Sequence, residues 1–141
     1  IVYCDKVDPS GDDAPRAFRM RQDAHSTALG KSILACKTID ELKNIYKTYS
    51  LYKHTKNTIT TVDGLIANLN RVKKNGYSIN EAETFDYVNG LGAAILDSEG
   101  RAIAGISISG TKSTINLKTI PDLAKKVKLA AEKISKRLRD S

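Results

Sequence analysis

Apolar residues recur at helical spacing in four segments of the chain. The clearest segment lies between Thr61, which we expect to cap a helix, and Gly76, which we expect to end it. Residues 38–41, Thr-Ile-Asp-Glu, are typical of a helix cap, so another helix should follow Thr38. A shorter helix should cover "TALGKSILAC", residues 27–36. A long amphipathic helix is predicted from about Pro121. Its apolar stripe, which suits a core or dimer contact, consists of Ile120, Leu123, Ala124, Val127, Ala131, Ile134 and Leu138.

Alternating and strongly apolar runs predict the strands. The segments "LGAAILD" (91–97) and "RAIAGISIS" (101–109) are joined by a short turn, so they predict an antiparallel hairpin. "IVYCDKVD" (1–8) predicts an opening strand, "RAFRM" (16–20) a second strand, and "YSIN" (77–80) a short extended segment. Because the hairpin follows a run of helices, the order favours an α+β fold in which helices pack on an antiparallel sheet.

The composition is that of one globular domain. The chain has 141 residues, of which 40% are hydrophobic and 28% are charged. Its apolar runs are far shorter than the roughly 20 residues that span a bilayer, so we expect no membrane contact. Residues 117–141 carry eight basic and three acidic side chains and hold most of the net charge of +7. A basic helix can bind nucleic acid, but we favour a solvated charged face.

Gly30-Lys31-Ser32 matches the end of the phosphate-binding motif G-x-x-x-x-G-K-[ST]. In that motif the first glycine lets the backbone wrap around a phosphate, and here the position holds His25. The preceding residues are also too polar for a buried parallel strand. We therefore interpret the segment as the start of a capped core helix, whose free N–H groups can still attract an anion.

Side chains with catalytic potential are few. The only histidines, His25 and His54, do not have a metal-ligand spacing, and no nucleophile motif is present, so the sequence predicts no metal and no cofactor. The most notable polar pair is Ser107 and Ser109, because residues two apart in a strand point to the same face. The two hydroxyls can bind a carboxylate or carbonyl, or they can be solvated on an exposed face. Strand geometry leaves both interpretations open.

Four segments occur in the order found in one known family: "HSTALGKSILA", "TITTVDGLIANLNRVKKNGYSINEAE", "AAILDSEGRAIAGISISG" and "LAKKVKLAAEKISKRL". They resemble the effector-binding domain of the IclR family of bacterial transcriptional regulators. The resemblance implies a GAF-like fold over residues 1–141, in which a curved antiparallel sheet holds a small metabolite. It also implies an upstream winged helix-turn-helix domain that binds operator DNA. We expect that domain to be missing from this chain, which has no initiator Met.

The resemblance further implies a site for a small organic acid, aldehyde or aromatic acid. Serine hydroxyls and the backbone amides at a helix start would hold the ligand. Asn80 and Gly90 stand where the family usually has Asp and Cys, so a carboxylate and a thiol are replaced. The implied ligand-binding residues are Ala28, Leu29, Asn80, Gly90, Ser107 and Ser109.

We therefore expect a cytoplasmic, non-enzymatic regulator that forms a homo-oligomer, either a dimer or a tetramer, and contacts DNA only through the missing domain. Cys4 and Cys36 fit this compartment as reduced, half-buried thiols. Two other functions stay open. One is a small enzyme on the same scaffold, which turnover of a bound metabolite would reveal. The other is a basic nucleic-acid-binding module, which salt-sensitive binding of duplex DNA would reveal.

Overall fold

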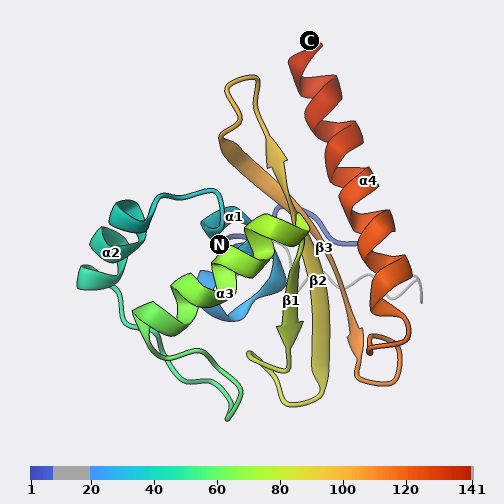
Figure 1. The fold of residues 1–141 in the computed structure, drawn as a ribbon. Helices are drawn as coiled ribbons and strands as arrows, with labels where there is room; N and C mark the ends of the chain where they lie inside the picture. Colours follow the sequence, from blue (N-terminus) through green and yellow to red (C-terminus); the bar gives the residue numbers. More distant parts are fainter. Residues whose placement is uncertain (8–19, 141) are drawn as a thin grey trace.

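A three-stranded antiparallel sheet lies between two layers of helices in the computed structural model, which describes residues 1–7 and 20–140 (Figure 1). The strands are β1 (Ser78–Glu81), β2 (Val88–Leu96) and β3 (Ala102–Thr111), in that order across the sheet. The helices are a 3₁₀ turn η1 (Ala24–Ser26), α1 (Ala28–Leu34), α2 (Ile39–Thr48), α3 (Val62–Asn75) and α4 (Ile120–Arg139). The α+β fold predicted from the sequence is confirmed.

Strand β2 contributes to both faces of the sheet because successive residues of a strand point in opposite directions. Leu91, Ala93 and Ile95 are buried and pack with apolar residues of α4. Gly90 and Gly92 point to the other face, where α1 lies close to the backbone. The absence of side chains at these glycines allows the start of α1 to approach the sheet.

The helices α1, α2 and α3 form a second apolar cluster beside the sheet. Its buried residues are Leu34, Ala35, Leu42, Leu65, Leu69 and Val72. The caps predicted for the two longer helices are confirmed. Thr38 and Glu41 form a reciprocal capping box at α2, and the Thr61 hydroxyl accepts a hydrogen bond from the Gly64 amide at 3.2 Å. Gly76 ends α3 with a φ of 75°, a left-handed conformation that favours glycine.

The opening strand is the main incorrect prediction for the fold. Residues 1–7 form no strand, and the only β contact they make within the described chain is an isolated bridge between Val2 and Arg21. Residue 8 and most of the "RAFRM" segment lie outside the described residues. A strand is stable only when several residues pair in succession, so local alternation alone did not predict the outcome.

The predicted α4 stripe is divided between core and surface, and the exposure of the two cysteines differs from the expectation. On α4, Ile120, Ala124, Val127 and Ala131 are buried, but Ile134 and Leu138 near its end are 36% and 49% exposed. Cys4 and Cys36 are both exposed free thiols, not half-buried ones.

Within the described residues, no helix has both the length and the apolar character needed to cross a membrane.

Candidate functional site

The sheet register brings polar and small residues together on the face that α1 covers. Residues paired across antiparallel strands have their side chains on the same face. Ser78 pairs with Gly92, which pairs with Ser107, and these form a first row. Asn80 pairs with Gly90, which pairs with Ser109, and these form a second row. Ile106 and Ile108 pack on the opposite side with the α4 cluster, as the sequence predicted.

The start of α1 is fixed directly above the first row. A methyl group at Gly92 would lie 2.6 Å from the Ala28 carbonyl oxygen and 2.9 Å from the Leu29 amide nitrogen, so only glycine fits there. The buried Ser78 hydroxyl donates a hydrogen bond to that same Ala28 carbonyl. The Ala28 methyl group lies 3.5 Å from where a methyl at Gly90 would be. The structure therefore brings all six sequence-predicted residues to one face of the sheet.

The polar groups around the second row can act as hydrogen-bond donors. Within α1, Gly30 donates to the Thr27 hydroxyl and Lys31 donates to the Thr27 carbonyl. The amides of Ala28 and Leu29 precede these and have no acceptor within the helix. Asn80 is buried and its Oδ1 accepts from the Glu83 amide at 2.8 Å, so its Nδ2 is the group that can serve a ligand.

Ser107 is half-buried and Ser109 is exposed. Among the described residues, neither hydroxyl takes part in a hydrogen bond, so both are available to a ligand. The register places both hydroxyls on one face of the sheet, as the two-residue spacing in β3 predicted.

A buried ion pair beside this site was not predicted from the sequence. Lys31 Nζ lies 2.5 Å from Glu83 Oε1, and the two side chains are 0% and 6% exposed. Burial lowers the pKa of Lys31 and raises the pKa of Glu83, and the contact between the two opposes both shifts. Glu83 Oε2 is buried with no hydrogen-bond partner in the described part of the chain. The partners are 52 residues apart, so no local motif could indicate the pair.

This pair also explains the Gly30-Lys31-Ser32 segment. The lysine of a phosphate-binding loop reaches the phosphates, whereas Lys31 is committed to a carboxylate inside the protein. A methyl at Gly30 would lie 2.3 Å from the Ala24 carbonyl oxygen, so this glycine serves close packing between η1 and α1. The interpretation of the segment as a core helix is supported.

An open hollow of about 750 Å³ lies elsewhere, where η1 meets α2 and the segments around residues 1 and 54. Its lining includes Asp23, His25, Tyr46, His54 and Phe85. None of the six predicted ligand-binding residues lines it. This hollow was not predicted from the sequence, because its lining residues come from segments that share no motif.

Comparison with known proteins identifies the family. The family described as "Bacterial transcriptional regulator IclR C-terminal" matches residues 1–136. The regulator KdgR of Escherichia coli is 30% identical over 141 residues, which cover 96% of this chain and 52% of KdgR. The regulator KipR of Bacillus subtilis is 29% identical over 140 residues, which cover 97% of this chain and 55% of KipR.

Solved structures agree with these matches. The crystal structure of Thermotoga maritima IclR superposes with a TM-score of 0.87 at 37% identity, covering 97% of this chain and 56% of that one. The C-terminal domain of E. coli KdgR superposes with a TM-score of 0.81 at 29% identity, covering 86% of this chain and 74% of that one. This chain spans about half the length of the curated relatives it matches.

The family matches also bear on the class of function. The relatives are named transcriptional regulators or repressors, so the chain is related to non-enzymatic regulators, as the sequence predicted. The match covers nearly the whole chain and agrees with the order of helices and strands. The chain belongs to the IclR family of bacterial transcriptional regulators, where it corresponds to the C-terminal domain.

Proposed function

We propose that this chain is the effector-sensing domain of a transcriptional regulator. Its ligand, a small organic acid, aldehyde or aromatic acid, would bind where the row of Asn80, Gly90 and Ser109 meets the start of α1. The observation that carries the proposal is the convergence of donors from three separate segments on one face of the sheet.

The donors suit a ligand that accepts hydrogen bonds. The hydroxyls of Ser107 and Ser109 and the Nδ2 group of Asn80 can each donate to a carboxylate or carbonyl oxygen. The amides at Ala28 and Leu29 add the partial positive charge of a helix start. Asn80 is neutral, so it adds no repulsion against an acid, whereas an aspartate at that position would.

Gly90 determines how much space the ligand has. A methyl at this position would lie 3.2 Å from the Ile108 carbonyl oxygen, 3.5 Å from the Ala28 methyl and 3.8 Å from Cβ of Asn80. A side chain here would therefore occupy the small space between these groups. We infer that the ligand approaches the backbone of Gly90, between Ala28 and Asn80.

The test begins with a thermal-shift panel of short oxo acids, hydroxy acids, aldehydes and aromatic acids. A compound that binds only the folded protein raises its melting temperature. For a compound found in this way, calorimetry on Ser107→Ala and Ser109→Ala should show binding weakened by roughly 5- to 150-fold each, because an acceptor loses its donor. The control is Ser98→Ala, which removes an exposed hydroxyl in the β2–β3 turn and should leave affinity unchanged.

A further variant distinguishes an acid from a neutral ligand. Asn80→Asp keeps an oxygen that can accept from the Glu83 amide, but it turns the donor that faces the ligand into a charged acceptor. It should weaken an acid more than an aldehyde of similar size. If both serine variants bind the compound as tightly as the parent chain does, the ligand site lies elsewhere.

The proposal extends to partners. Ile134 and Leu138 continue the apolar stripe of α4 beyond its buried part and are 36% and 49% exposed, which supports a homo-oligomer formed through the end of this helix. Operator binding would belong to a helix-turn-helix domain encoded outside this chain, and the full regulator would act in the cytoplasm. The basic residues of α4 then serve as a solvated face.

A further inference from the structure

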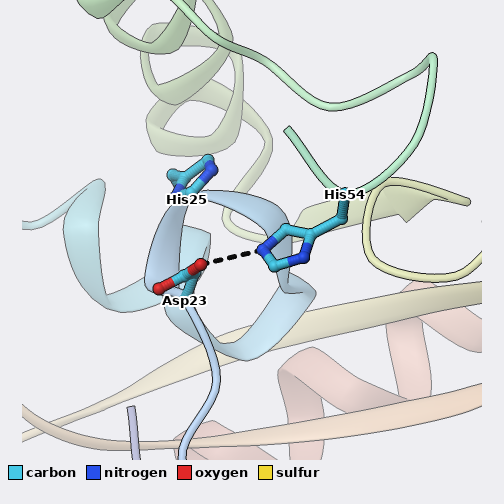
Figure 2. Close-up of side chains that lie close together, drawn as sticks. All are labelled: Asp23, His25 and His54. Carbon is cyan, nitrogen blue, oxygen red and sulfur yellow. Dashed lines mark hydrogen bonds and ion pairs between the residues drawn. The ribbon is translucent and has the colours of Figure 1, made fainter. Parts of the chain in front are cut away.

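Three potential metal ligands meet at the hollow, away from the proposed effector site (Figure 2). Asp23 precedes η1, His25 lies within it, and His54 comes from the loop between α2 and α3. One ligand atom from each side chain lies within 4.8 Å of the other two. Within residues 1–7 and 20–140, no other group of three His, Cys, Asp or Glu side chains comes this close.

A hydrogen bond fixes the ring of His25. Its side chain is buried, and Nε2 lies 2.9 Å from the Tyr52 carbonyl oxygen. A carbonyl only accepts, so Nε2 carries the proton and Nδ1 keeps its lone pair. Nδ1 has no hydrogen bond to any described residue. Metal-binding histidines commonly donate their second ring N–H to a carbonyl in this way.

The donor set carries one charged group. A histidine binds a metal ion through its neutral ring, so the two imidazoles add no charge to the site. Asp23 supplies the negative charge that offsets part of the charge of a divalent ion.

We propose that Asp23, His25 and His54 bind a divalent transition-metal ion of the zinc class. Two imidazoles and one carboxylate are a donor set that suits this class. Three protein ligands leave at least one coordination position, and the hollow on which the cluster borders gives water or a small anion access to it. The site would also tie the loop at His54 to η1, which leads directly into α1.

The side chains need only a modest adjustment to close around the ion. In a tetrahedral site with bonds of about 2.0–2.2 Å, ligand atoms lie roughly 3.4 Å apart. His54 Nε2 and Asp23 Oδ2 lie 2.8 Å apart in a hydrogen bond that Nε2 donates, and an ion bound there would replace that proton. These two side chains are 26% and 48% exposed, so they can rotate toward the buried His25. His25 is the fixed member and the other two are the adaptable ones.

The test is a titration of the metal-free 141-residue chain with Zn²⁺ by calorimetry and with Co²⁺ by visible absorption. Cys4 and Cys36 are exposed thiols that bind zinc on their own, so the parent for all measurements carries Cys4→Ser and Cys36→Ser. We expect one ion per chain, a higher melting temperature with Zn²⁺, and the strong visible bands of tetrahedrally coordinated Co²⁺.

Two variants assign the ligands without disturbing the core. His54→Ala and Asp23→Asn change exposed side chains and should each weaken Zn²⁺ binding by more than the roughly 10- to 100-fold that loss of an outer contact costs. Asp63→Asn removes the same charge from an exposed position on α3 and should leave affinity unchanged. Absence of one-to-one binding in the cysteine-free parent would overturn the proposal. So would binding that survives both His54→Ala and Asp23→Asn.

Discussion

Replacing Lys31 by methionine would remove the cation from the buried pair that joins α1 to the segment after β1. Methionine fills a similar volume, so the main consequence is a Glu83 carboxylate left buried without its partner. Glu83 Oε1 contacts Lys31, and Oε2 has no hydrogen-bond partner in the described chain to compensate. Breaking a buried pair in this way typically costs about 3–5 kcal/mol. In a domain of this size that loss lowers the melting temperature by roughly 10–20 °C.

The loss should depend on pH. Burial already raises the pKa of Glu83, and Lys31 opposes that rise, so the variant raises the pKa further. A carboxyl whose folded pKa exceeds its unfolded value binds protons more tightly in the folded state. The proton's contribution to stability is complete below the unfolded pKa and is lost as pH rises through the folded pKa. Urea denaturation should therefore show a smaller defect, relative to the parent chain, at pH 5 than at pH 8.

Two further variants make the reasoning refutable. Lys37→Met breaks a pair with Glu41 whose side chains are 43% and 49% exposed, and it should cost only about 0–1 kcal/mol. Lys31→Met combined with Glu83→Leu should recover most of the lost stability, because no unpaired charge remains. If Lys31→Met costs no more than Lys37→Met, or if the double variant recovers nothing, the pair does not have the assigned role.

The glycines of β2 should respond differently to alanine. Gly92→Ala places a methyl 2.6 Å from the Ala28 carbonyl oxygen and should cost about 1–3 kcal/mol or more in urea denaturation. Gly90→Ala places a methyl 3.2 Å from the Ile108 carbonyl oxygen, so it should cost less stability than Gly92→Ala while weakening effector binding. Equal losses of stability would contradict this packing. In sedimentation at tens of micromolar, the chain should run as an oligomer, and a monomer would refute this expectation. The chain should not co-sediment with duplex DNA. Salt-resistant, sequence-specific DNA binding would refute this second expectation.

Local sequence determined the elements whose signals lie within a few residues. Thr38 and Thr61 cap their helices, Gly76 ends α3, and the runs on either side of residues 98–100 form the hairpin, all as predicted. The spacing of Ser107 and Ser109 also placed both hydroxyls on one face. These features were predictable because hydrogen bonds and side-chain periodicity within one element decide them.

Tertiary structure decided the contacts between distant segments. The sequence predicted a strand at residues 1–8, but pairing at Val2 and Arg21 does not extend through the described residues. The sequence placed Lys31 in a core helix and not in a phosphate-binding loop, but it did not predict the burial of Lys31 against Glu83. Strand pairing and ion pairing depend on which segment the fold places opposite. The sequence of one segment does not predict that partner.

The effector face and the metal site differ in how far the sequence predicted them. For the effector face, the resemblance to the IclR family supplied the residues, and the register of β1, β2 and β3 then brought Asn80, Gly90 and Ser109 into one row. Asp23 and His54 are 31 residues apart and share no ligand spacing, so the sequence alone predicted no metal site. Their proximity arises only when the loop before α3 folds back onto η1, because chain folding, not sequence spacing, sets the distance between such residues.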